Sequence, residues 1–224
     1  MLKKKNILFL SIILIIVLGF IGIHIKDKKC IANKAKDLSQ TDILDIKEKM
    51  NIVISQSYEI MKTGKAVDYN NVVKNQKLLE LLNKTNEFKV EWFKFIDIKI
   101  PSYKSELTIK KVQPSYDNTY FIACNYDVEF KIISSDVVSS AKDEYEFEVK
   151  KINGKFYITK MLDVQLDIRE MDKKPHNNMK KDFSNYNKIL DSQISSTDEI
   201  LKNIDKYKKE FKEGKLGYNK KILK

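Results

Sequence analysis

Several residue types on which protein chemistry most often depends are scarce in this 224-residue sequence. It contains two histidines, two cysteines and a single arginine, Arg169. Two cysteines, Cys30 and Cys124, are too few for a scaffold held together by disulfides. The six glycines are isolated, which excludes a glycine-rich phosphate loop, and no Cys, His and Asp residues have the spacing of metal ligands. We therefore expect neither a cofactor nor a metal.

The same shortage argues against catalysis. His24 lies inside an uncharged N-terminal run, and His176 follows Pro175 in a predicted loop. Cys124 falls on the apolar parity of a predicted strand, which favours a small core side chain over a thiolate nucleophile. No pattern brings a nucleophile and a base together, so we expect a protein that is not an enzyme.

The near absence of arginine also argues against a nucleic acid partner. The net charge is +11, but the lysines are scattered, and the side chain that best reads bases and phosphates is almost missing. We expect no nucleic acid partner, while solvated lysines, lipid headgroups and teichoic acids remain as explanations of the charge. A sequence rich in Lys, Ile and Asn and poor in Arg is typical of an AT-rich genome, so we expect a Gram-positive bacterium.

One long hydrophobic run is present. It extends from Asn6 to Ile25, twenty residues without a charge, between a basic N-terminal tail and Lys26. At about 1.5 Å per residue such a helix reaches roughly 30 Å, the thickness of the hydrocarbon core of a bilayer. A short tail with three lysines favours the inside. The sequence predicts a single-pass cell-membrane protein with tail and anchor at 1–25, a stalk at 26–40 and its C-terminal domain outside.

Processing of this segment has two alternatives. Lipidation at Cys30 requires small apolar residues before the cysteine, where Asp27, Lys28 and Lys29 stand. Cleavage at Cys30-Ile31-Ala32 stays an alternative, although the apolar run is longer than the roughly 7–15 residues of a signal peptide. We expect an anchor that is not cleaved.

Residues 41–174 predict one extracytoplasmic α+β domain. Helical spacing indicates a helix capped by Thr41 and closed by Gly64, and a second, shorter helix near residues 72–82. From Phe88 onward apolar residues alternate, which predicts strands; the clearest is 120–132, with one buried and one wet face. A Ser- and Asp-rich loop at 133–142 leads to a hairpin with a type I′ turn at Asn153-Gly154. The expected fold is two helices packed on a curved antiparallel sheet.

Trp92, Phe93 and Phe95 form an aromatic group in the first predicted strand. On a strand they would place large rings on both faces of the sheet. One face would meet the helices, and the other would line a pocket mouth or a partner surface, with a thick curved-sheet core as the alternative. These three residues are the candidate partner or pocket surface.

Residues 175–224 predict a helical tail or linker. Apolar residues recur every seventh position, with Thr197 weakening the series, which is compatible with a coiled coil between two chains. Ser196 and Glu199 have the spacing of a capping box that would start a new helix. Two helices packed on their own domain, or a helical linker, are therefore favoured over the coiled coil. The series consists of Phe183, Leu190, Thr197, Ile204 and Phe211.

Within residues 78–167 the sequence resembles a known family. The matching features are Val90-Glu91-Trp92-Phe93, the Tyr126-Asp127-Val128-Glu129-Phe130 strand, and the hairpin from Lys151 to Ile158. They resemble the N-terminal, non-catalytic region of membrane-attached or secreted clostridial proteins of the amidase domain family, and the order of elements is that of the cone-shaped nuclear transport factor 2-like fold. Tyr218-Asn219-Lys220 resembles the Tyr-Asn-Arg with which the family's catalytic domain begins.

The family's nucleophile lies in an Asn-Cys-(Thr or Ala)-Asn-Phe segment that this sequence does not contain, so no catalytic residue is carried over. The resemblance implies a binding or accessory module at the cell envelope, the N-terminal half of an amidase-like cell-wall protein. Its partner would be a cell-wall polymer or an envelope protein. The alternative is a scaffold subunit of a conjugation or secretion machine, which would also carry a nuclear transport factor 2-like domain on one span.

The predicted anchor has a direct test. Protease added to intact protoplasts should digest the C-terminal domain, and the protein should stay with the membranes through an alkaline wash, because a spanning helix is not released by charge neutralisation. A domain protected from protease, or a protein found in the wash, would contradict the predicted topology.

Overall fold

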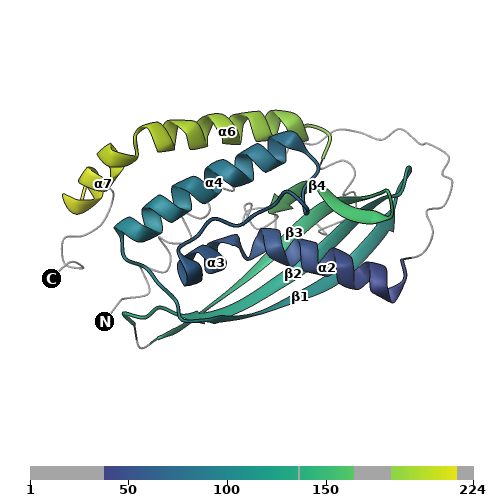
Figure 1. Ribbon diagram of the computed structural model, residues 1–224, viewed down its shortest axis with the longest axis horizontal. Helices are drawn as coiled ribbons and strands as arrows, with labels where there is room; N and C mark the ends of the chain where they lie inside the picture. The colour runs from purple at the N-terminus through teal and green to yellow at the C-terminus, as the bar shows by residue number, and fades with distance from the viewer. Residues whose placement is uncertain (1–37, 136, 164–182, 216–224) are drawn as a thin grey trace, which may run out of the picture.

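The computed structural model describes residues 38–135, 137–163 and 183–215. Four strands form one antiparallel sheet in the order β1-β2-β3-β4. The helices lie on one side of this sheet, with α4 beside α3 and with α6 and α7 along the outer side of α4 (Figure 1). The predicted α+β class is confirmed, and the nuclear transport factor 2-like cone stays a prediction. The elements are α2 (Gln40–Ile54), α3 (Gln56–Thr63), α4 (Gln76–Phe95), β1 (Tyr103–Pro114), β2 (Thr119–Lys131), β3 (Val138–Ile152), β4 (Lys155–Asp163), α6 (Tyr186–Lys202) and α7 (Ile204–Lys212).

The first predicted helix is two helices. Ser39, not Thr41, caps α2, because its side chain accepts the Asp42 N–H while Asp42 accepts the Ser39 N–H in a capping box. The chain bends at Ser55, where α3 begins, and α3 ends at Gly64 in the left-handed conformation, as predicted. The bend turns α3 toward α4.

The strand predicted from Phe88 is wrong, because the second helix continues to Phe95. Phe88, Trp92 and Phe95 are four and three residues apart, which is the spacing of one helix face as well as an imperfect alternation. Neither glycine nor proline interrupts the twenty residues from Gln76, and Asn75 caps them by accepting the Leu78 N–H. A helix therefore satisfies the backbone hydrogen bonds of this segment, which a strand without a neighbouring strand would leave unpaired.

The sheet confirms the hairpin and corrects one of its faces. Asn153 and Gly154 both have positive φ, as a type I′ turn requires, and β3 pairs with β4 around them. β3 starts at Val138, so the preceding loop is shorter than predicted. The face of β2 predicted to be wet is buried at Phe121, Ala123 and Asn125. Phe121 lies under the ring of Phe183, whose centroid is 5.9 Å away, which explains its burial.

The C-terminal helices pack on their own domain. α6 runs without a break through Ser196, so the predicted capping box does not start a helix there, and the break falls at Asn203. α4 and α6 run in the same direction and are joined by ion pairs from Lys77 to Asp191 at 2.6 Å and from Lys84 to Asp198 at 2.5 Å. The apolar series therefore faces α4 and the sheet, with Leu190 and Thr197 fully buried.

No helix in the part of the chain that the structure describes is long and apolar enough to cross a membrane. The predicted anchor from Asn6 to Ile25, Cys30 and the stalk up to residue 37 lie outside those residues, as do His24 and His176, while Ser39 and Gln40 at the end of the predicted stalk already belong to the start of α2.

Cys124 lies in the core, as its parity predicted. Its side chain is 1% exposed, and burial raises the pKa of the thiol to about 12. In a Cys30→Ser background, we expect the native protein to react with a thiol reagent only at its unfolding rate. Replacement of Cys124 by Ala should lower the free energy of unfolding by about 1 kcal/mol, and replacement by Asp should prevent folding, because a buried charge there has no partner. Rapid labelling of the native protein at neutral pH would contradict the burial.

Candidate functional site

A chain of buried polar side chains connects α3 to α4. Lys89 Nζ donates to Gln56 Oε1 at 2.9 Å, and Gln56 Nε2 donates to Asn86 Oδ1 at 2.9 Å and to the Leu82 carbonyl at 3.1 Å. Asn86 in turn donates to the Val67 carbonyl at 2.8 Å. Polar groups this deep in a protein are stable only when hydrogen-bonded, and here each amide is satisfied by the next.

Lys89 reaches this position because of where it sits on α4. It lies seven residues after Leu82 and three before Trp92, on the stripe of α4 that packs into the core. Lys89 is 3% exposed, and its ammonium donates one hydrogen bond, to Gln56. Among the described residues no carboxylate forms an ion pair with it. A buried lysine of this kind is rare, since even a paired charge is expensive to bury.

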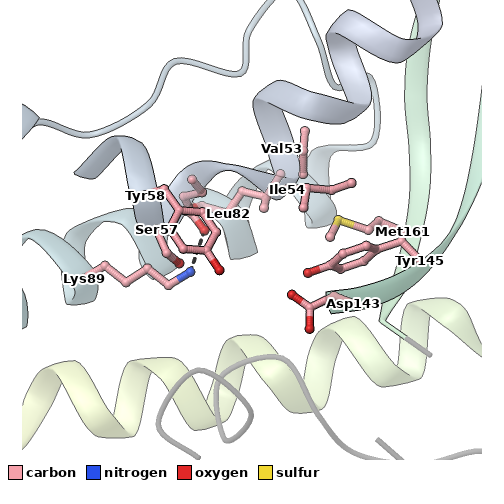
Figure 2. Close-up of a pocket in the computed structure, with 10 residues that line it drawn as sticks. Val53, Ile54, Ser57, Tyr58, Leu82, Lys89, Asp143, Tyr145 and Met161 are labelled. Atoms are coloured by element: carbon pink, nitrogen blue, oxygen red, sulfur yellow. Dashed lines mark hydrogen bonds between the residues drawn. The ribbon is translucent and has the colours of Figure 1, made fainter. Parts of the chain in front are cut away.

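A small polar cavity lies beside the lysine, between α3, α4 and the sheet. Its volume of about 20 Å³ holds roughly one water molecule. Figure 2 shows Lys89 Nζ, the hydroxyls of Tyr58 and Tyr145, and the Asp143 carboxylate turned toward this space. The rest of the lining is polar at Gln56 and Ser57 and apolar at Val53, Ile54, Leu82 and Met161.

The cavity perturbs the ionisable groups around it. Burial lowers the pKa of Lys89 to about 7, because no anion compensates the desolvated ammonium. Burial raises the pKa of Asp143, and the neighbouring carboxylate of Asp127 raises it further. Burial and the charge of Asp143 raise the pKa values of Tyr58 and Tyr145, so both phenols stay protonated.

Three of these groups point into the cavity without a partner. The structure assigns no hydrogen bond among its described residues to the Asp143 carboxylate or to the hydroxyls of Tyr58 and Tyr145. Tyr145 as a whole is 3% exposed, whereas Asp143 is half-buried and its carboxylate also meets solvent. The arrangement presents hydrogen-bond donors at the Lys89 end and an acceptor at the Asp143 end. It is suited to a small polar group that both accepts and donates.

The aromatic group predicted from the sequence lies elsewhere. Trp92 and Phe93 are buried, and Phe95 is half-buried. The Trp92 ring packs against Phe95 at 5.5 Å and edge-on against Phe211 of α7 at 5.6 Å. The expectation that they occupy two faces of a sheet is wrong, because they belong to a helix whose outer side α7 covers. The structure does not bring them into the Lys89 cavity.

The sequence analysis missed Lys89, Asp143 and Tyr58. The strand predicted from Phe88 hid the signal, since a charged residue on the apolar stripe of a helix is the pattern that marks a buried lysine. On a strand, Lys89 would point to the solvent-facing side, where a lysine is expected. Among the described residues, no three His, Cys, Asp or Glu side chains are arranged to hold a metal ion.

Comparison with known proteins gives no family for this chain. No protein-family model matches it, and no curated protein matches it. Solved structures with a similar arrangement include the intermembrane space region of the chloroplast protein ARC6, which is 11% identical with a TM-score of 0.38 over 57% of this chain and 98% of that one. A periplasmic fragment of TraM is 9% identical, with a TM-score of 0.30 over 51% and 96% of the two chains.

A third similar structure is an NTF-2 like protein of unknown function from Shewanella oneidensis MR-1. It is 10% identical, with a TM-score of 0.28 over 52% of this chain and 97% of that chain. Because all three TM-scores are below 0.5, the proposals below rest on the residues of this chain alone.

The buried lysine has a consequence for stability that depends on pH. The folded-state pKa of Lys89 is about 7, below the unfolded value of about 10.4, so between these values the unfolded chain binds the extra proton. Stability from this group is therefore lowest below pH 7 and rises with pH. We expect the free energy of unfolding in urea to increase by about 3 kcal/mol between about pH 6.5 and pH 9.5.

Lys89→Met should abolish most of that increase. At about pH 6.5 the variant should be more stable than the wild type, even though Gln56 loses a hydrogen bond worth about 1 kcal/mol. Lys110→Met, at an exposed position of β1, is the matched control and should leave the pH dependence unchanged. A Lys89→Met variant less stable than the wild type at pH 6.5 would mean that the ammonium is paired.

Proposed function

We propose that this chain is a non-catalytic binding module, tethered to the outer face of the cell membrane by residues 6–25, that engages a cell-envelope component through the Lys89 cavity. The observation that carries the proposal is an unpaired, buried ammonium facing polar groups that have no partner of their own. A folded protein gains stability by replacing such a lysine with an apolar residue. Retention of a destabilising charge in a cavity is typical of a functional site.

The chemistry of the cavity favours a carboxamide or peptide group as the bound moiety. Its carbonyl would accept from Lys89 Nζ and the Tyr58 hydroxyl, and its N–H would donate to Asp143. The volume of about 20 Å³ is that of roughly one water molecule, so a terminal carboxamide of a larger molecule would enter only after the lining side chains move apart. Peptide cross-links and amidated side chains of cell-wall peptidoglycan carry such groups, so a cell-wall polymer is the partner we propose.

The Lys89 cavity is suited to binding a polar group and not to catalysis. Lys89 as a neutral amine could act as a base, but the cavity has no space for a substrate beside a nucleophile. We propose a role like that of the non-catalytic region that the sequence resembles, which is to hold a wall polymer while another chain or domain acts on it. Incubation of the purified protein with peptidoglycan fragments should release no amine above the uncatalysed background.

The decisive experiment measures binding and stability of the same variants. The full chain in detergent micelles is sedimented with purified peptidoglycan from which teichoic acids have been removed, so that lysines elsewhere have no polyanion to bind. We expect Lys89→Met to lose at least tenfold in affinity while being no less stable than the wild type. Tyr145→Phe should lose less, and Lys110→Met should bind as the wild type does.

Two results would overturn the proposal. Binding by Lys89→Met at wild-type affinity would remove the cavity from the function. Failure of the wild type to sediment with the wall material would exclude peptidoglycan as the partner.

A further inference from the structure

A row of lysines follows the outer face of the C-terminal helices. Lys202 ends α6, and beyond the break at Asn203 the lysines Lys206, Lys209 and Lys212 follow in α7 at intervals of three residues. All four side chains are exposed. We call these four residues the lysine stripe.

The opposite side of the same helices fixes the direction of the stripe. Phe211 packs edge-on against Trp92, and Lys208 forms an ion pair with Glu91 of α4 at 2.6 Å. These contacts hold the inner side of α7 on α4. Lys202, Lys206 and Lys209 therefore point away from the domain, along the outer margin that α6 and α7 form in Figure 1, whereas Lys212 Nζ turns back over the Phe95 ring, 5.3 Å from its centroid.

The charge of the chain is concentrated toward this end. From Lys202 to Lys224 the sequence has nine lysines and three acidic residues, a net charge of +6 out of +11 for the whole chain. Within the stripe, Lys206 lies 3.9 Å from Glu210, and the carboxylates of Glu199 and Asp205 are exposed beside it. The described residues provide no ion pair for Lys202 or Lys209. The surface is positive and open to an extended anionic partner.

We propose that the lysine stripe binds the anionic lipid surface of the membrane in which the chain is anchored. This inference rests on the anchor of the proposed function. Twelve residues separate Ile25 from Leu38, and at most about 3.6 Å per residue this tether keeps the domain within roughly 45 Å of the bilayer. A tethered patch meets the lipid at a high effective concentration, so weak contacts by individual lysines suffice.

A membrane fits this surface better than a soluble polyanion does. Lys202, Lys206 and Lys209 lie along the outer side of helices that are held on α4, which presents them together to a plane. Docking along the ridge would lay the helices flat on the bilayer and turn the sheet away from it. Teichoic acids, which lack a fixed plane, are the alternative that the test must separate.

The single tryptophan reports this orientation, because Trp92 lies directly beneath Phe211 of α7. The full chain is reconstituted into vesicles of phosphatidylcholine, or of phosphatidylcholine with phosphatidylglycerol, each containing a trace of dansyl-labelled lipid. Flotation after an alkaline wash shows first whether the chain is anchored. Energy transfer from Trp92 to the dansyl group then measures how close α7 lies to the surface.

We expect transfer to be at least twofold higher with phosphatidylglycerol and to fall to the phosphatidylcholine level in high salt. The triple variant Lys202→Glu, Lys206→Glu and Lys209→Glu should abolish the difference, and the corresponding Gln variant should reduce it. A control with the same change of charge, Lys99→Glu, Lys104→Glu and Lys110→Glu, alters exposed positions near or on β1 and should leave transfer unchanged.

The outcomes separate a failure of the lysine stripe from a failure of the membrane anchor. A chain that fails to float with either vesicle contradicts the anchor. A chain that floats but shows equal transfer with and without phosphatidylglycerol contradicts the role of the stripe. Transfer that falls when free teichoic acid competes at low concentration would assign the stripe to the polymer instead.

Discussion

The packing of α4 on two sides is the constraint on which the rest of the structure depends. One side of this helix lies against α3 and the sheet, and the other lies beneath α6 and α7. A helix enclosed in this way should be apolar nearly all round. Instead it carries Lys89 and Asn86 into the interior, where Gln56 of α3 accepts from Lys89 and donates to Asn86, and Asn86 also donates to the Val67 carbonyl. The bend at Ser55 matters because it places Gln56 next to the buried polar side chains of α4.

The two sides of α4 differ in character, with a polar cavity on the inner side and aromatic packing on the outer side. On the inner side, the hydrogen-bond chain ends at a cavity in which Asp143 and two tyrosines have no partner among the described residues. On the outer side, aromatic packing between Trp92, Phe95 and Phe211 joins α4 to α7, and ion pairs from α4 to α6 and α7 flank it. Binding at the cavity and docking by the outer helices would therefore act on opposite sides of a single rigid element.

Elements with one dominant signal could be predicted from the sequence. The Asn153-Gly154 turn, the burial of Cys124 and the α+β class each followed from a local pattern, and the structure confirms them. The segment from Phe88 to Phe95 was mistaken for a strand, because aromatic residues alternate there as well as recurring at helical spacing. Only contact with α7, more than a hundred residues later in the chain, makes the helical pattern the one that is buried.

The cavity could not be predicted for a related reason. Its lining comes from α2, α3, α4, β3 and β4, and no sequence pattern relates Lys89 to Asp143 or Tyr58. The buried lysine would have been visible only after the helix was placed correctly. The face of β2 predicted to be wet shows the same limit, since Phe183 of the C-terminal segment covers it.

The most direct measurement is a nuclear magnetic resonance titration of the Lys89 side chain in protein with isotope-labelled lysine. Its signal is assigned by its absence from the spectrum of Lys89→Met. We expect the Lys89 amine to titrate near pH 7, well below the value of about 10.4 for a lysine in an unfolded chain. A Lys89 signal that titrates near the reference value of about 10.4 would contradict the burial of an unpaired ammonium, because the group would then be solvated or paired.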